Sequence, residues 1–135
     1  MKDPAVRAFL KYARLGLDRR DLTSAELALR LRGSFSEVGV AELMTVYDTL
    51  RVLEAVGKGE SAEAVRAVYF RGRGRTPRKN DISYAVLRFA RERSMDERTA
   101  WRRLYEARRL YTVLLKGQMP SRQWCRRQVF RFRWP

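Results

Sequence analysis

Helix start and stop signals divide this chain into about six short segments, and they constrain its fold more than any other feature. Asp3 followed by Pro4 is typical of an N-cap with proline at the first helical position. Thr23 and Glu26 stand at the spacing of a capping box. Glycines follow three of the segments as C-terminal stops, namely Gly16, Gly33 and Gly57. The sequence predicts helices over about 4–15, 24–32, 38–55, 61–70, 82–93 and 96–116.

Apolar residues recur every three or four positions in these segments, which predicts buried helix faces. The last segment carries a long stripe, made of Ala100, Leu104, Ala107, Tyr111 and Leu114. The segment before it presents Ile82, Val86, Phe89 and Ala90. The predicted caps of the last three helices are Ser61, either Asn80 or Asp81, and Asp96. The predicted fold class is therefore all-α, with a long last helix.

Length and composition favour one domain without a membrane segment. The 135 residues, 45% of them hydrophobic, suffice for one compact domain with a modest core. No run of about 18 apolar residues occurs, so we expect no membrane span, no signal peptide, no membrane partner and a cytoplasmic location. The single cysteine, Cys125, and the lack of histidine exclude an intramolecular disulfide, the usual zinc sites and His-based catalysis. We therefore expect no enzyme activity, no metal and no cofactor.

The excess of positive charge is confined to the second half of the chain. Residues 1–65 hold ten Lys or Arg and ten Asp or Glu, whereas residues 66–135 hold twenty and five, a net charge of +15. Twenty-five of the thirty basic residues are arginine, whose planar guanidinium binds phosphate or guanine through two hydrogen bonds. A high-GC genome would explain the preference for arginine but not the segregation of charge. The asymmetry therefore predicts binding to a nucleic acid.

The sequence RGRGRTPRKN, residues 71–80, is a predicted loop between two helices, because Gly72, Gly74 and Pro77 favour turns. No strand precedes it and no Gly-Lys-Ser/Thr follows, so it does not match a nucleotide-binding loop. One interpretation is an arm that enters the minor groove. We favour contacts with DNA phosphates. The residues expected to make them are Arg71, Arg73, Arg75, Arg78 and Lys79.

Only two or three residues separate the last two predicted helices, which predicts a steep crossing and a helix-turn-helix arrangement. A DNA-reading pair needs long donors at the start of its second helix, because that end enters the major groove. The residues at this position, away from the apolar stripe, are Arg98, Thr99, Arg102 and Arg103. Ser94 stands where glycine is usual in the turn. The alternative is a helical hairpin whose arginines are merely solvated.

The order and spacing of these segments resemble a known family over about residues 42–115. The segments concerned are AVRAVYF (64–70), a loop, the helix 82–93 and DERTAWRRLYEARRL (96–110). They are similar to the phage-encoded transcriptional regulators of the ArpU and RinA type, whose C-terminal part resembles region 4 of sigma factors. Asp96 stands in place of the family's Ser cap, Arg98, Thr99 and Arg102 match directly, Trp101 replaces the second aromatic residue, and Ala100 departs from the first. The resemblance implies a regulator of late phage genes that binds duplex DNA near a promoter.

Charge and motifs together predict three regions. Residues 1–58 form a neutral helical region expected to bind a protein, either RNA polymerase or a second copy of the chain. Residues 59–117 form the basic helix-turn-helix region that would bind DNA, and residues 118–135 form a basic aromatic tail. In the tail, Phe130, Phe132 and Trp134 alternate with arginines, which predicts an extended strip. The strip could pack on the long helix, pair two copies as a homodimer, or bind DNA or an anionic membrane.

The predicted function is a sequence-specific, duplex-DNA-binding transcriptional regulator of phage or prophage late genes, without catalytic activity. Two other classes stay open: the DNA-recognition subunit of a phage packaging terminase, and an RNA-binding antiterminator that uses the same loop. A nuclease is not favoured, because the acidic residues of the basic half resemble helix caps and surface groups rather than a metal-binding cluster. These residues are Asp81, Glu92, Asp96, Glu97 and Glu106.

Overall fold

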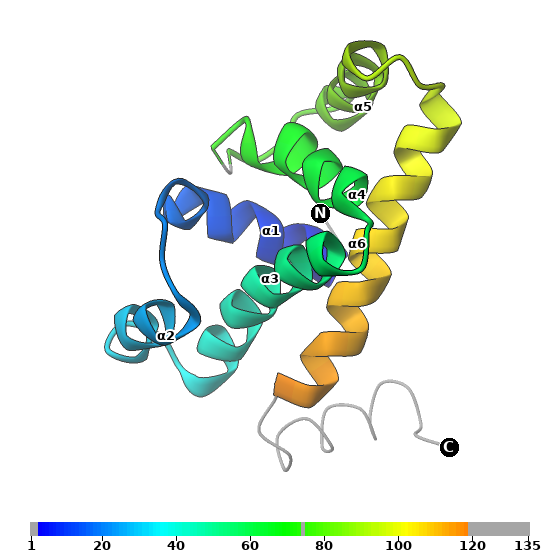
Figure 1. The fold of residues 1–135 in the computed structure, drawn as a ribbon. Helices are drawn as coiled ribbons and strands as arrows, with labels where there is room; N and C mark the ends of the chain where they lie inside the picture. The colour runs from blue at the N-terminus through cyan, green and yellow to red at the C-terminus, as the bar shows by residue number, and fades with distance from the viewer. Residues whose placement is uncertain (1–2, 74, 119–135) are drawn as a thin grey trace, which may run out of the picture.

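The described part of the chain is a bundle of six α-helices without a strand (Figure 1). The computed structural model describes residues 3–73 and 75–118. The helices are α1 (Pro4–Arg14), α2 (Ser24–Arg32), α3 (Glu37–Ala55), α4 (Gly59–Val65), α5 (Asp81–Glu92) and α6 (Glu97–Gln118). A 3₁₀ turn, η1 (Leu17–Arg19), follows α1, and a π-helical turn, η2 (Arg66–Phe70), continues α4. The predicted all-α class is confirmed. In these residues no helix combines the length and the apolar character needed to cross a membrane.

The predicted caps of α1 and α2 are confirmed. The Asp3 carboxylate accepts a hydrogen bond from the backbone N–H of Ala5 at 2.8 Å, and Pro4 takes the first helical position. In α2, the Glu26 backbone N–H donates to Thr23 Oγ1 at 3.2 Å, while the Glu26 carboxylate accepts from the Thr23 backbone N–H. Both helices thus begin where local side chains satisfy otherwise unpaired N–H groups.

The predicted side-chain caps of α4 and α5 do not form. Ser61 does not cap α4, which begins at Gly59, and its buried hydroxyl has no hydrogen-bond partner among the described residues. Asn80 does precede α5, but its backbone is left-handed (φ 74°) and its side chain makes no capping bond. The Asp81 carboxylate instead accepts a hydrogen bond from the Arg78 backbone N–H at 2.8 Å. Residue type alone identified these candidates, whereas burial and backbone conformation decided their roles.

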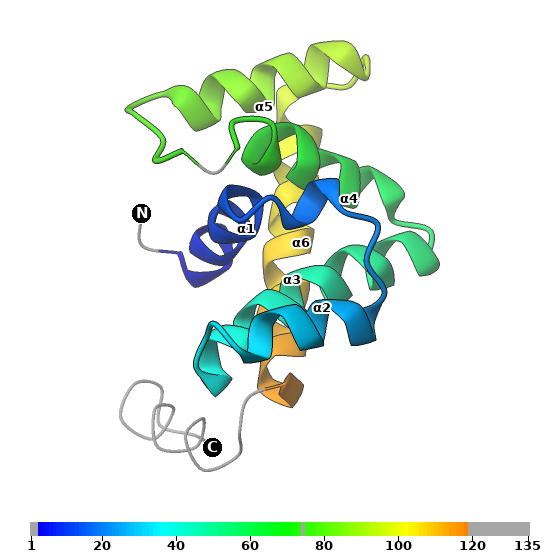
Figure 2. The same cartoon turned by 90° about the vertical axis from the view of Figure 1, so that its left-hand side faces the viewer.

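Helix α6 runs along one side of the bundle, and α1, α3, α4 and α5 all pack against it (Figures 1 and 2). Its buried stripe is Ala100, Leu104, Ala107, Tyr111 and Leu115. The last member is thus Leu115 rather than the predicted Leu114. Helix α2 lies against α3, at the end of the bundle opposite to α5 (Figure 2).

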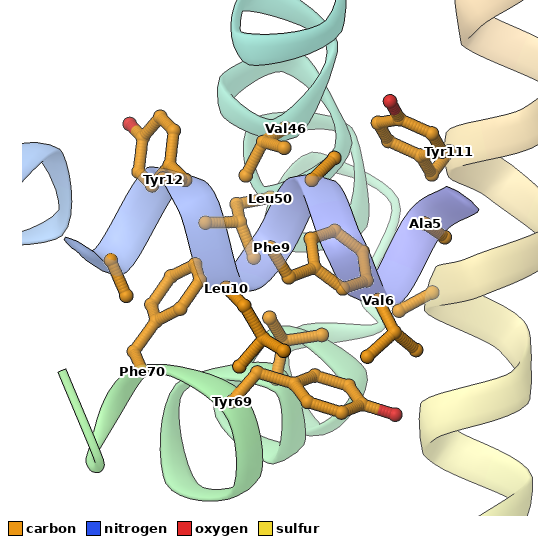
Figure 3. Close-up of a cluster of buried hydrophobic side chains, with 14 of the residues drawn as sticks. Ala5, Val6, Phe9, Leu10, Tyr12, Val46, Leu50, Tyr69, Phe70 and Tyr111 are labelled. Carbon is orange, nitrogen blue, oxygen red and sulfur yellow. The ribbon is translucent and has the colours of Figure 1, made fainter. Parts of the chain in front are cut away.

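Three aromatic rings from distant parts of the chain meet in the core (Figure 3). The Phe9 ring of α1 is fully buried, and its centroid lies 5.6 Å from that of Tyr69 in η2 and 5.7 Å from that of Tyr111 in α6. The buried apolar side chains of the described residues form one cluster, to which all six helices contribute. The predicted boundary between residues 58 and 59 separates a neutral from a basic region, but it does not divide the hydrophobic core. That the first region binds a protein and the second binds DNA stays a prediction.

The π-helical turn η2 places three successive side chains in this core. The Arg71 backbone N–H donates to the Arg66 carbonyl, five residues back, at 3.0 Å. Val68, Tyr69 and Phe70 are all buried, and Phe70 stacks on Tyr12 of α1 with ring centroids 5.7 Å apart. The chain therefore leaves the core for the arginine-rich loop at a position held by packing.

An ion pair fastens the start of α1 to α6. Arg108 Nε donates to Asp3 Oδ2 at 3.0 Å, and a second guanidinium nitrogen contacts the same oxygen. Partial burial raises the pKa of Asp3, but the hydrogen bond from Arg108 and those from the backbone N–H groups of Val6 and Ala5 outweigh burial. The net effect lowers the pKa of Asp3 below its ordinary value, so this carboxylate stays charged at neutral pH.

The predicted aromatic tail begins at the end of α6. Gln118 is the last described residue, and residues 119–135 lie outside the described part of the chain. The predicted strip of Phe130, Phe132 and Trp134, and its three alternative roles, therefore stay predictions.

Candidate nucleic-acid interface

A tight turn joins α5 to α6. The Ser94 backbone N–H donates to the Arg91 carbonyl at 3.2 Å, and the Met95 backbone N–H donates to the Ala90 carbonyl at 2.9 Å. These two bonds form a Schellman motif, in which the residue after the C-cap adopts a left-handed conformation. Ser94 is that residue, with φ 52°. The helix-turn-helix pattern predicts glycine at this position, and the left-handed backbone of Ser94 would indeed favour glycine.

Replacing Ser94 with glycine is expected to raise the free energy of unfolding by about 0.5–1 kcal/mol. A left-handed backbone costs a side-chain-bearing residue about 1–2 kcal/mol, part of which glycine loses again through the entropy of the unfolded chain. Urea unfolding followed by circular dichroism measures the change. The matched control is Gly57→Ser, since Gly57 has φ 80° and nothing lies within 4 Å of an added Cβ. That reverse exchange should destabilise, and a Ser94→Gly protein less stable than the parent would contradict the strain argument.

Helix α6 begins with the predicted aspartate cap. Asp96 Oδ1 accepts a hydrogen bond from the Thr99 backbone N–H at 2.7 Å. This bond, followed by one from the Thr99 hydroxyl and by the charges of Arg102 and Arg98, lowers the pKa of Asp96. Thr99 is half-buried and serves the cap. It therefore supports the start of α6 through its backbone N–H.

Two of the three predicted arginines at the start of α6 point into solvent. Arg98 and Arg102 are exposed, stand one helical turn apart, and form no ion pair with any described carboxylate. We call Arg98 and Arg102 the arginine pair. They lie on the face of α6 opposite to the buried Ala100 and Leu104, where a groove of DNA can approach.

Arg103 differs, because it is bound to the protein itself. Its Nη1 donates to Glu106 Oε1 at 3.0 Å, and Lys58 Nζ donates to Glu106 Oε2 at 2.8 Å. The hydrogen bond from Lys58, together with that from Arg103, lowers the pKa of Glu106 although partial burial opposes this. The Glu106 side chain is only 17% exposed and that of Arg103 32%. Glu106 thus joins α6 to Lys58, which precedes α4, and holds the Arg103 guanidinium on its own helix.

The exposed face of α6 extends beyond the arginine pair. Tyr105 and Arg109 are exposed and follow Arg102 by three and seven residues, which keeps them on the same face of α6. The Tyr105 ring stacks on Trp101, with centroids 5.9 Å apart. Sequence reasoning missed Arg109, although alternating helical spacings of four and three residues from Arg98 would have found it.

The arginine-rich loop is exposed, and one of its arginines is paired. The basic loop, defined as residues 71–73 and 75–80, connects η2 to α5. Arg71 Nη2 lies 3.2 Å from Glu92 Oε1 at the far end of α5. No ion pair to a described carboxylate engages the others, which are Arg73, Arg75, Arg78 and Lys79. Arg73 has a left-handed backbone, with φ 57°.

A groove of about 730 Å³ lies between the basic loop, η2 and α5. Its apolar lining includes Leu10, Ala67, Val68 and Ile82, and its basic lining includes Arg71, Arg75, Arg78 and Arg88. Tyr84 also lines the groove and is 68% exposed. Sequence reasoning missed Tyr84 and Arg88, which are one turn apart on the side of α5 away from its buried face.

The C-terminal part of the basic loop, with Arg78 and Lys79, and the arginine pair lie at opposite ends of α5, whereas Arg71 pairs with Glu92 at the C-terminal end of α5. The loop precedes Asp81 and the pair follows the turn after Glu92 (Figures 1 and 2). Twelve helical residues span about 18 Å at 1.5 Å per residue. The structure therefore does not bring the predicted residues together as one patch: Arg78 and Lys79 lie at the start of α5, Arg71 lies beside its end, and the arginine pair follows the turn.

No protein-family model matches the chain, and no curated protein or solved structure shows significant similarity to it. Within residues 3–73 and 75–118, no three Cys, Asp or Glu side chains gather closely enough to hold a metal ion.

Proposed function

We propose that this protein is a cytoplasmic transcriptional regulator that binds duplex DNA through a helix-turn-helix formed by α5 and α6. The observation that carries the proposal is the arginine pair. Arg98 and Arg102 are exposed on the first turns of a helix that follows a tight turn, and neither forms an ion pair with a described carboxylate. Long donors at this end of a second helix are the groups that reach base edges in the major groove.

The basic loop supplies the sequence-independent part of the binding. The loop cations that form no ion pair with a described carboxylate are Arg73, Arg75, Arg78 and Lys79. Each phosphate that they neutralise releases condensed counterions, which favours binding at low salt. The length of α5, about 18 Å, separates the end of the loop at Arg78 and Lys79 from the arginine pair. This part of the loop would contact the DNA backbone beside the bases that the pair reads.

The neutral helices would bind a protein partner, either RNA polymerase or a second copy of the chain. Helix α2 supports this part of the proposal, because it lies at the edge of the bundle and carries Leu29, whose side chain is 72% exposed. The resemblance to the ArpU and RinA regulators favours late phage or prophage genes as the regulated genes.

Selection of the purified protein on a random duplex library, at about physiological salt, tests the proposal. We expect an enriched DNA motif after sequencing of the retained duplexes, because the arginine pair discriminates between bases. A symmetric motif would indicate two copies on one site. Tight binding without any enriched motif would contradict sequence reading and favour the packaging role. Preference for a hairpin RNA over duplex DNA at equal salt would favour the antiterminator.

A further inference from the structure

The groove beside α5 has features that a clamp on duplex phosphates does not need. Its lining combines apolar side chains from α1, η2 and α5 with the exposed ring of Tyr84. Phosphate contacts need only cations and N–H groups. Bases stacked inside a duplex do not offer their faces to a protein, so this apolar surface and ring would have no partner on paired DNA.

The chemistry of the groove fits a nucleotide whose base is unpaired. An exposed aromatic ring stacks on the face of any base, and arginines around it hold the adjoining phosphates. Arg75, Arg78 and Arg88 surround the groove, and no described carboxylate forms an ion pair with them. The one acidic residue in the lining, Asp81, is engaged by the Arg78 backbone N–H. A volume of about 730 Å³ falls in the range of roughly 300–1,000 Å³ that is typical of ligand pockets.

We propose that this groove binds one or two unpaired nucleotides of a DNA strand, with a base stacked on Tyr84 and the phosphates held by Arg75, Arg78 and Arg88. The choice of DNA rests on the proposed function, because the arginine pair would hold a DNA duplex at the other end of α5. An unpaired end or opened segment of that DNA would then lie within reach of the groove.

Fluorescence anisotropy with a labelled tetrathymidylate tests the groove without any duplex. Tyr84→Ala should weaken binding by about 5- to 150-fold, the range for the loss of one stacked base. Tyr84→Phe keeps the ring and should stay within about twofold of the parent. Arg88→Ala should weaken binding and flatten its salt dependence. Tyr84 and Arg88 are exposed, so their replacement should leave the thermal unfolding curve unchanged.

Matched controls lie on α2, far from the groove (Figure 2). Leu29→Ala removes an exposed apolar side chain, and Arg30→Ala removes one positive charge. Neither should change the affinity for tetrathymidylate by more than about twofold, because exposed charges so distant are largely screened. Equal weakening by Arg30→Ala and Arg88→Ala would overturn the groove assignment in favour of general attraction.

Other outcomes separate this proposal from the proposed function. Failure to bind tetrathymidylate, or equal binding by the parent and Tyr84→Ala, overturns the groove assignment even where a duplex motif is found. Tyr84-dependent binding of tetrathymidylate without any duplex motif supports the groove and contradicts the sequence-reading regulator. A tetrauridylate bound more than about tenfold tighter than tetrathymidylate overturns the choice of DNA.

Discussion

Replacing Phe9 with alanine is expected to lower the free energy of unfolding by about 3–5 kcal/mol, the range for removal of a large buried aromatic side chain. The Phe9 ring is fully buried and touches the rings of Tyr69 and Tyr111. Domains of this size have total stabilities of about 5–15 kcal/mol, so the variant would lose a large fraction. Urea unfolding followed by circular dichroism measures the change.

The same variant tests whether the neutral and basic regions fold together. Because Phe9 belongs to α1 and its partners to η2 and α6, we expect one unfolding transition, with nucleic-acid binding lost along it. Leu29→Ala is the control, since a side chain that is 72% exposed should change stability by less than about 0.5 kcal/mol. Two separate transitions, with binding preserved after α1 unfolds, would show that the regions fold independently.

Replacing Arg98 or Arg102 with alanine should relax the preference for the selected DNA motif by about 1–3 kcal/mol for each base that the guanidinium no longer binds. This corresponds to about 5- to 150-fold in the ratio of affinities for the selected and an unrelated duplex. The physical reason is that a bidentate guanidinium discriminates one base edge from the others. Titration of both duplexes at one salt concentration gives the ratio directly.

Two arginine variants serve as controls for this prediction. Arg103→Ala removes the same charge from the next position of α6, but from a guanidinium that binds Glu106, so it should leave the preference unchanged. Arg73→Ala should weaken binding to both duplexes and reduce the salt slope by about 0.9. An unchanged preference in Arg102→Ala, or a new preferred sequence in Arg73→Ala, would reject the division between base reading and phosphate contact.

Local signals predicted the helices well because they act within one turn. The Asp3 and Asp96 caps and the Thr23–Glu26 box depend on spacings of two or three residues, and each appears as predicted. Ser61 failed because its position is buried, and burial is a property of the whole fold. The π-helical turn at Arg66–Phe70 likewise has no cap or spacing signal in the sequence.

The candidate site was less accessible to sequence reasoning, because ion pairs join residues far apart in the chain. Arg71 pairs with Glu92, 21 residues away, and Lys58 pairs with Glu106, 48 residues away. Only the pair of Arg103 with Glu106 is local, at a spacing of three. Composition does not distinguish between the arginines of the basic half. The ion pairs show which of them are bound to a carboxylate and which are exposed without one. The exposure of Tyr84 could not be predicted locally, because it depends on which side of α5 packs against the bundle.

The length of α5 has a consequence for the DNA. Successive base pairs rise 3.4 Å along a strand, so about 18 Å corresponds to roughly five base pairs, or half a helical turn. With α5 along the duplex axis, the side of the DNA that presents a major groove to Arg98 and Arg102 would present a minor groove to Arg78 and Lys79, which directly precede α5. One copy of the protein would then contact a major groove and the next minor groove on the same face of the DNA. Adding one helical turn to α5 would move the loop contact and the arginine-pair contact out of phase with the double helix.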